Sequence, residues 1–166
     1  MSIEEPAASR PYMPDYGVQD ANQGTGLLPW SWARQRLIDS HDYWLATRWP
    51  EGRPHVMPVW GVWMEGALWF SSGRRSRKAR NLAADPRCVV TTDTARDPVV
   101  VEGVAELVEK QPAVAAFAGW INAKYESSYP MEFFLAHTTF RVRPVWAFAL
   151  MEGDFTGSPT RWMFER

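Results

Sequence analysis

The sequence has few of the residues that build covalent or metal-dependent sites. It contains one cysteine and three histidines in 166 residues. The single cysteine, Cys88, excludes a disulfide within the chain and makes a cytoplasmic protein the default expectation. The histidines His41, His55 and His137 lie far apart, and no C-x-x-C or H-x-x-E-H spacing occurs, so no metal site is predicted.

Long apolar runs and a strong net charge are also missing. No run approaches the roughly 20 apolar residues needed to cross a bilayer, and the acidic, proline-containing start does not resemble a signal peptide. The formal net charge is −1, which argues against a general polyanion-binding surface. We therefore expect one domain whose partners include neither nucleic acid nor a membrane.

Motifs for nucleophilic catalysis and nucleotide binding are absent as well. There is no G-x-S-x-G, and Cys88 falls in an apolar strand pattern that predicts a buried, inert thiol. No carboxylate pair suits glycoside hydrolysis, and neither G-x-x-x-x-G-K-[ST] nor G-x-G-x-x-G occurs. Redox chemistry supplied by a bound cofactor remains, for which the protein need only bind, orient and exclude water.

Residues 71–82 carry an unusual density of positive charge. Five of the seven residues from Arg74 to Arg80 are basic, and Ser71-Ser72-Gly73 precede them. Hydroxyls, backbone N–H groups and a helix start with nearby Lys or Arg form the usual cradle for a phosphate group. The alternative, a solvated helix face, stays open, because most charge runs are of that kind.

Apolar periodicity predicts the secondary structure. Alternating patterns indicate six strands, over residues 43–48, 55–64, 67–71, 87–92, 99–108 and 138–150. Helical patterns cover residues 32–39 with Ser31 as N-cap, 76–84 with Ser76 as N-cap, and 112–125 with Pro112 in the first turn.

The order of these elements predicts the fold. Six strands in mostly hairpin order, with short flanking helices, predict a mainly β protein with a closed antiparallel barrel over residues 27–166. Residues 1–26, with repeated Pro and Gly, are expected to form a mobile N-terminal arm. Ten tryptophans indicate an aromatic interface or a flat pocket for a planar ligand, with ordinary core packing as an equal alternative.

Four sequence patterns together resemble a known family. They are G-R-P-x-x-x-P-V-W (52–60), S-S-x(3)-S-R-K-x-R-N-L (71–82), D-P-R (85–87) and V-E-G-x-A (101–105). This arrangement resembles the pyridoxamine 5′-phosphate oxidase-like, flavin-binding split-barrel proteins. Within them it is most similar to the branch that uses the deazaflavin coenzyme F(420), over roughly residues 42–108.

The resemblance implies a homodimer of six-stranded split β-barrels with two cofactor sites at the interface. It assigns the cofactor phosphate to Lys78 and the ring to Pro58, Val59 and Trp60. The remaining cofactor contacts that we expect from the basic stretch are Ser71, Ser72, Arg75, Ser76, Arg77 and Asn81. A second subunit would close the site through its arm, Trp146 or Trp162.

The resemblance also implies a flavin- or deazaflavin-dependent oxidoreductase that transfers hydride between bound F(420), or FMN, and a small electrophilic substrate. The Arg74-Arg75 pair favours F(420), whose acidic tail continues beyond its phosphate. Oxidation of vitamin B6 is not expected, because the pattern that holds pyridoxal phosphate is missing. A non-catalytic binding or storage protein, an FMN-dependent oxidase and a purely structural dimer remain alternatives. No catalytic side chain is predicted, and solvent could supply the proton.

Overall fold

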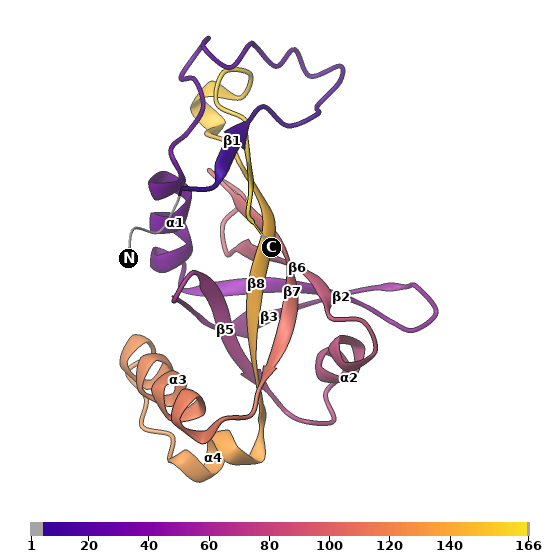
Figure 1. Ribbon diagram of the computed structural model, residues 1–166, viewed down its shortest axis with the longest axis vertical. Helices are drawn as coiled ribbons and strands as arrows, with labels where there is room; N and C mark the ends of the chain where they lie inside the picture. The colour runs from indigo at the N-terminus through magenta and orange to yellow at the C-terminus, as the bar shows by residue number, and fades with distance from the viewer. Residues whose placement is uncertain (1–4, 166) are drawn as a thin grey trace.

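One antiparallel sheet organises the structure (Figure 1). The computed structural model describes residues 5–165 of the chain. In that range the sheet has nine strands: β1 (Ala7–Ser9), β2 (Asp42–Arg48), β3 (Pro54–Trp60), β4 (Val62–Met64), β5 (Ala67–Ser72), β6 (Arg87–Thr92), β7 (Val99–Val108), β8 (Thr138–Ala149) and β9 (Thr160–Met163). The mainly β, antiparallel fold is confirmed, and β6 and β7 have the predicted bounds.

The helices are short and flank the sheet. They are α1 (Trp30–Asp39), α2 (Arg77–Ala84), α3 (Gln111–Lys124), α4 (Met131–Ala136) and the 3₁₀ helix η1 (Glu152–Asp154). The prediction that Ser31 caps α1 is wrong, because the helix begins at Trp30 and Pro29 occupies the N-cap position. Ser76 does cap α2, as predicted. Within residues 5–165 no helix has the length and apolar character to span a membrane.

The sheet is split rather than closed. Its main path runs β1-β9-β8-β7-β6-β2-β3, and β5 branches from β8 and pairs with β4. Strands β3 and β4, predicted as one strand over residues 55–64, are divided at Gly61 and lie at opposite ends of the sheet. The expected hydrogen-bonded closure of the barrel is therefore wrong for the described strands, and the number of strands exceeds six because of this division and of the short strands β1 and β9.

Gly61 is required by crowding at this division. A Cβ atom there would lie 3.1 Å from the carbonyl oxygen of Trp69, 3.1 Å from the Tyr43 ring and 3.2 Å from a methyl group of Leu68. These separations are shorter than most contacts of a real Cβ. Glycine lets the chain cross from one edge of the sheet to the other in a single residue.

Two apolar clusters hold the elements together. The larger one fills the interior of the sheet and includes Tyr43, Phe70 and Trp162. The smaller one packs α3 and α4 against β4 and β5, with Phe117 and Phe134 at its centre. Burial of each such aromatic side chain is worth about 1.5–3 kcal/mol, so α3 and α4 are held firmly against one end of the sheet.

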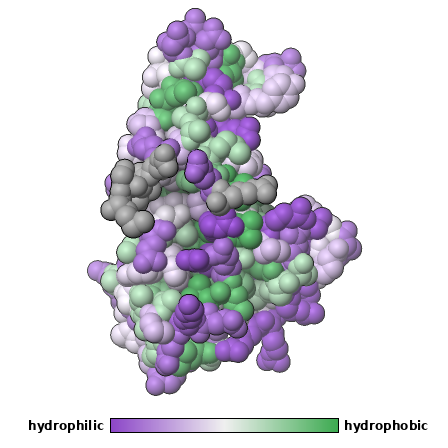
Figure 2. Space-filling view, in the orientation of Figure 1, coloured by the Kyte–Doolittle hydropathy of each residue, from purple (hydrophilic) through white to green (hydrophobic). Residues whose placement is uncertain are grey.

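The N-terminal segment packs on the same chain. Strand β1 pairs antiparallel with β9, and the Arg10 guanidinium donates five hydrogen bonds to backbone carbonyls, those of Gln19, Asp20, Gln23, Gly157 and Pro159. This segment and the loop before β9 form the top of the molecule in Figure 1. Figure 2 shows a hollow between that top and the projecting β2–β3 hairpin, with hydrophobic residues at its base. The division into a mobile arm, 1–26, and a domain, 27–166, stays a prediction.

Candidate functional site

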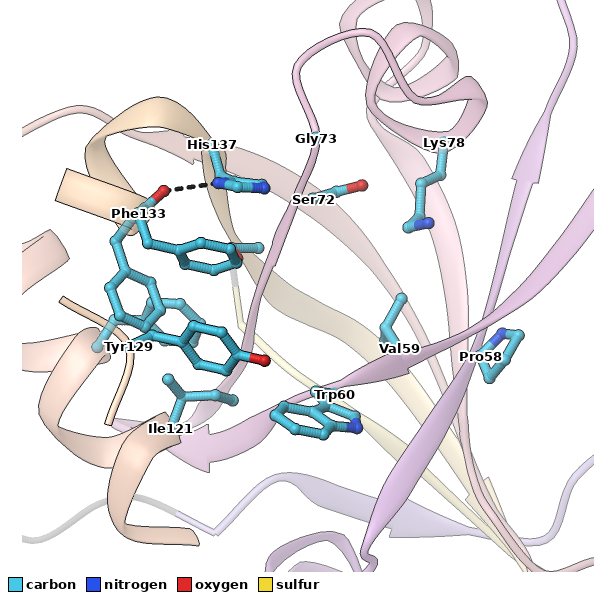
Figure 3. A pocket seen from close by; sticks show the side chains of 13 residues that line it. Pro58, Val59, Trp60, Ser72, Gly73, Lys78, Ile121, Tyr129, Phe133 and His137 are labelled. Atoms are coloured by element: carbon cyan, nitrogen blue, oxygen red, sulfur yellow. Dashed lines mark hydrogen bonds between the residues drawn. The ribbon is translucent and has the colours of Figure 1, made fainter. Parts of the chain in front are cut away.

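A cavity of about 410 Å³ lies where β3, β5, α2 and the α3–α4 region meet (Figure 3). Six of the predicted cofactor-binding residues line it: Pro58, Val59, Trp60, Ser71, Ser72 and Lys78. The remaining lining residues are Gly73, Phe117, Ile121, Tyr129, Phe133, Phe134 and His137. The cavity therefore has a strand floor, a polar loop with one cation, and an aromatic wall.

Lys78 supplies the positive charge of this cavity. It lies in the first turn of α2, at the positive end of the helix dipole, and its side chain points toward the cavity in Figure 3. Partial burial lowers the pKa of Lys78, and among residues 5–165 no carboxylate lines the cavity to offset the effect. An ammonium group held in this way is suited to an anionic ligand group such as a phosphate.

The serines next to Lys78 shape the loop. Ser72 is buried, and its Oγ lies 2.7 Å from the Oγ of Ser76. The Ser76 hydroxyl also accepts a hydrogen bond from the Ala79 N–H at 3.2 Å, so it serves as the N-cap of α2. Ser71 and Ser72 line the cavity, whereas Ser76 lies behind them and orients Ser72.

The arginines of the basic stretch are distributed around the cavity rather than inside it. Arg74 donates to the carbonyls of Leu135 and Ala136 at the end of α4. The Arg77 guanidinium lies 3.8 Å from the ring centre of Trp49. Arg75 is exposed and outside the cavity lining. The stretch is therefore not merely a solvated helix face, because two of its arginines have specific partners elsewhere in the chain.

Asn81 does not lie in the cavity, contrary to the expectation that it faces the same groove. Its side chain is fully buried, and Nδ2 donates to the Thr47 Oγ1 at 3.0 Å. Its Oδ1 accepts from Arg77 at 3.4 Å. One turn of helix separates Arg77 from Asn81, so both side chains face β2 while Lys78 faces the cavity. Asn81 thus fixes α2 on the sheet.

The floor of the cavity is the end of β3. Val59 is buried and Trp60 is 46% exposed, because successive side chains of a strand point to opposite faces of the sheet. The Trp60 ring stacks on Tyr125 with ring centres 4.2 Å apart and an interplanar angle of 3°. Trp162, expected to reach the partner's site, is instead fully buried in the core of its own chain.

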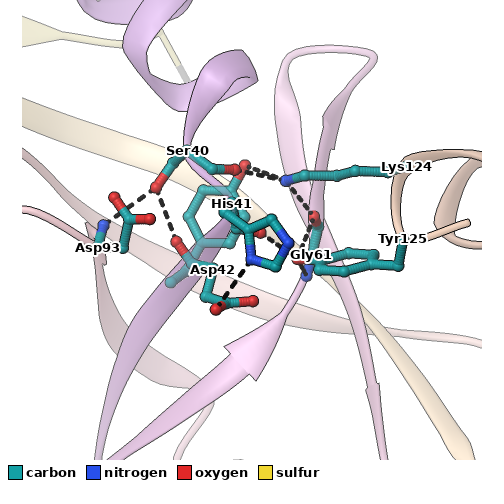
Figure 4. A network of polar contacts seen from close by, with 8 residues as sticks. Ser40, His41, Asp42, Gly61, Asp93, Lys124 and Tyr125 are labelled. Atoms are coloured by element: carbon teal, nitrogen blue, oxygen red, sulfur yellow. Dashed lines mark hydrogen bonds and ion pairs between the residues drawn. The ribbon is translucent and has the colours of Figure 1, made fainter.

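A polar network beside the cavity fixes Trp60 and Gly61 (Figure 4). The Tyr125 hydroxyl accepts from the Gly61 N–H at 2.9 Å and donates to the His41 carbonyl. Lys124 Nζ donates to the carbonyls of Ser40 and Gly61, at 2.6 and 2.7 Å, and to the Tyr43 hydroxyl. Burial lowers the pKa of Lys124 to about 8 and raises the pKa of Tyr125 to about 12. This network ties α3 to the division between β3 and β4.

The aromatic wall was not predicted. Tyr129, Phe133 and His137 stack in sequence, with ring centres 4.5 and 4.1 Å apart. The wall comes from α4 and the loop before it, and a helix of six residues is too short to give a recognisable helical repeat in the sequence. The closely spaced aromatics of residues 129–137 are the one signal in the sequence.

Other reactive groups lie away from this cavity. Cys88 is buried, and burial raises the pKa of its thiol to about 12, in agreement with the inert thiol expected from the sequence. Within residues 5–165, no cluster of three or more His, Cys, Asp or Glu side chains could hold a metal ion. The cavity at β3, β5 and α2 is therefore the candidate site.

Comparison with known proteins identifies the family of the chain. The pyridoxamine 5′-phosphate oxidase family model matches residues 33–156, which include every strand of the split sheet except β1 and β9. The chain belongs to the pyridoxamine 5′-phosphate oxidase family. At the level of the family, this membership supports flavin-related oxidoreductase chemistry. No curated protein shows a significant sequence match to the chain.

Several solved structures share the fold. An F(420) reductase is 25% identical, with 69% of this chain and 94% of that chain covered and a TM-score of 0.58. A conserved hypothetical protein from Mycobacterium tuberculosis is 23% identical, with coverages of 82% and 85% and a TM-score of 0.65. A FAD-binding protein from Mesorhizobium loti is 19% identical, with coverages of 81% and 94% and a TM-score of 0.60.

Proposed function

We propose that this protein is a cytoplasmic, homodimeric oxidoreductase that binds coenzyme F(420), or FMN, and transfers hydride to a small electrophilic molecule. The cofactor phosphate would bind at Lys78, Ser71 and Ser72, and the ring would lie along residues 58–60. The bound cofactor would supply the hydride. The protein would contribute position, orientation and shielding from water.

The observation that carries the proposal is the composition of the cavity. At one side lies a cation, Lys78, with no carboxylate beside it in the cavity lining formed by the described residues, and a flat strand with an exposed tryptophan forms the floor. The polar part fits a phosphate, and the apolar floor fits a planar ring. Both parts come from segments that the family model matches.

F(420) is favoured over FMN by the surroundings of Lys78. Arg75 and Arg80 are exposed on the same loop and helix, outside the cavity, where they add positive charge beyond the phosphate position. An acidic tail that leaves the cavity would pass through this field, whereas FMN ends at its phosphate. The similarity to an F(420) reductase at 25% identity supports the same choice.

A homodimer is supported by an apolar outer face of the sheet. Cross-strand partners share a face of the sheet, and one such row runs Pro58, Trp44, Thr91, Val100 and Phe148. The next row runs Val56, Ala46, Val89, Glu102 and Trp146. In a single chain Trp44 is 45% and Val56 is 52% exposed. This face begins at the cavity floor, so a second copy bound to it would also adjoin the cofactor.

One titration tests the proposed function. The purified full-length protein is titrated with FMN and, separately, with F(420), and binding is followed by quenching of tryptophan fluorescence. We expect tighter binding of F(420) and a chain that is colourless as purified. Failure to bind either cofactor would overturn the proposal and would favour a structural dimer.

The colour of the purified protein and its reaction with electrophiles distinguish the two other redox alternatives. A yellow protein that retains FMN during purification would indicate an FMN-dependent oxidase. Bound, reduced F(420) that stays reduced with every electrophile tested would indicate a storage or binding protein. Oxidation of the reduced cofactor by a conjugated ketone or a quinone, faster than in free solution, would establish the enzyme.

A further inference from the structure

His137 combines a fixed orientation with a free ring nitrogen in the candidate cavity. It follows α4 directly, and its Nδ1 lies 2.6 Å from the backbone carbonyl oxygen of Phe133. Its ring stacks on the Phe133 ring with centres 4.1 Å apart. Figure 3 shows the second ring nitrogen, Nε2, pointing away from α4 into the cavity.

The contact with Phe133 determines which nitrogen of His137 carries the fixed proton. A carbonyl oxygen only accepts hydrogen bonds, so Nδ1 must be the donor. Nε2 then has a lone pair in the neutral ring and a proton in the imidazolium ion. No hydrogen-bond partner of Nε2 occurs among residues 5–165, which leaves this atom available to a ligand.

A side chain in the loop between β5 and α2 fixes the position of α4. Arg74 donates to the carbonyls of Leu135 and Ala136, at 2.6 and 3.1 Å, immediately before His137. The Arg74 guanidinium thus satisfies carbonyls at the end of α4 and interacts favourably with the helix dipole. His137 is therefore held by its ring contact and by its backbone, as a group that acts on a bound molecule must be.

The cavity separates an anion-binding side from an aromatic side. Lys78 lies on the α2 side, whereas Tyr129, Phe133 and His137 lie on the α4 side (Figure 3). If the cofactor phosphate occupies the α2 side, as the proposed function requires, then the aromatic wall faces the substrate. Stacked aromatic rings favour a flat, conjugated molecule, and one imidazole among them favours a molecule with an oxygen atom.

We propose that His137 is the catalytic acid of the hydride transfer, with Nε2 bound to an oxygen atom of the substrate. This inference rests on the proposed function. The substrate carbon accepts a hydride from the reduced cofactor, and the π electron pair moves to the oxygen. Nε2–H of the imidazolium then gives its proton to the substrate. The substrate gains two electrons and the cofactor loses two, and the imidazole takes a new proton from water.

The ionisable groups around His137 determine how a change in its protonation can be assigned. Lys78 and Tyr129 share the first cavity with it, and Arg74 and Glu109 share a second cavity behind it. A pH dependence that disappears when His137 is substituted, while these four neighbours stay in place, is therefore assigned to His137.

The first test needs no cofactor. Long-range ¹⁵N–¹H NMR spectra of the full-length wild-type protein report which nitrogen of each histidine is protonated in the neutral ring. We expect protonated Nδ1 and unprotonated Nε2 for His137, assigned by the loss of its signals in His137→Phe. A His137 signal with protonated Nε2 would overturn the proposal, because the cavity-facing atom would not then be the one that gains and loses the proton.

The second test measures binding and turnover. His137→Phe keeps the ring on Phe133, His137→Gln keeps a hydrogen-bond donor without an imidazole, and His41→Phe is the matched control outside the cavity. Menadione is the probe. We expect its Kd to rise about five- to tenfold in His137→Phe and to change little in the other two. Menadione reduction by bound, reduced F(420) should fall about 10²- to 10⁴-fold in both His137 variants, and the decrease in the wild-type rate with rising pH should be lost.

The outcomes separate this inference from the proposed function. If wild-type protein binds no cofactor, the proposed function fails and this inference fails with it. If wild-type protein turns over and His137→Gln keeps its rate and pH profile, only the role of His137 is refuted. If one His137 variant does not fold, the wild-type NMR result and the other variant still test the role of His137.

Discussion

At the scale of single residues, Lys78 carries the charge on which cofactor binding depends. Its substitution by Ala should weaken binding of F(420) by about 1.5–3 kcal/mol, or about 10- to 150-fold in Kd, the usual value of a charge-assisted hydrogen bond. Lys110→Ala is the matched control, because Lys110 is an exposed lysine at the start of α3 that does not line the cavity. Fluorescence titration measures both, and equal affinities for the two variants would refute the assignment of the phosphate to Lys78.

Lys124 predicts a pH dependence of stability. Its pKa is about 8 in the folded protein, below the ordinary lysine value of 10.5, because its ammonium group is partly buried. Between these values the unfolded chain binds more protons than the folded one, so this residue makes the free energy of unfolding increase with pH above about 8. The raised pKa of Tyr125, about 12, has the opposite effect only above pH 10, where the unfolded tyrosine ionises first.

The measurement is urea unfolding from pH 7.5 to 9.5 for the wild type and for Lys124→Met, which cannot titrate. We expect the free energy of unfolding of the wild type to increase relative to that of Lys124→Met as the pH rises. Lys110→Met, an exposed lysine at the start of the same helix, should show no such trend. A difference that stays constant over this range would show that the Lys124 ammonium is fully hydrated.

At the scale of elements, strand β1 depends on a single side chain. Arg10 links the turn after β1 to the loop before β9 through five hydrogen bonds to carbonyls. Arg10→Ala removes all five, so we expect the amides of residues 7–9 to exchange with solvent at least tenfold faster, with little change in β6 and β7. Hydrogen–deuterium exchange measures this, with Arg34→Ala on the exposed face of α1 as control. Unchanged exchange in residues 7–9 would mean that pairing with β9 alone holds the strand.

The elements also show where sequence reasoning succeeds. Strands β6 and β7 follow from a two-residue apolar repeat that is uninterrupted, and Ser76 follows from the chemistry of helix caps. The division at Gly61 did not follow, because its cause is crowding by Tyr43, Leu68 and Trp69, which lie elsewhere in the sequence. Helix α4 is held by contacts with Arg74, which lies 61 and 62 residues before Leu135 and Ala136, rather than by its own propensity.

For the same reason, only part of the candidate site could be predicted from the sequence. Lys78, Ser71 and Ser72 form a local pattern around one turn, and the structure brings them to the cavity with residues 58–60. The positions of Arg77 and Asn81 depend on Trp49 and Thr47, whose proximity to α2 only the folded sheet creates. His137 could not be assigned for the same reason, since no motif connects it to Ser72.

At the scale of the whole molecule, the apolar outer face of β2 and β3 predicts an assembly. A glutamate at position 44 would place a charge at the centre of this face, where it would lose hydration in a dimer. Trp44→Glu should therefore sediment as a monomer and lose most of its cofactor affinity, while the wild type sediments as a dimer. Ile38→Glu, on an exposed apolar residue of α1, should remain dimeric. A wild-type chain that is monomeric in analytical ultracentrifugation at high micromolar concentration would refute the homodimer.

The loop of residues 73–76 connects the two sides of the candidate cavity directly. Through Arg74 it is attached to the carboxyl end of α4, and through Ser76 it starts the helix that carries Lys78. The distance between the cation and the aromatic rings consequently depends on this loop as well as on the sheet beneath it. Relatives with a longer or shorter loop at this point would keep the same strands and yet accept ligands of a different width.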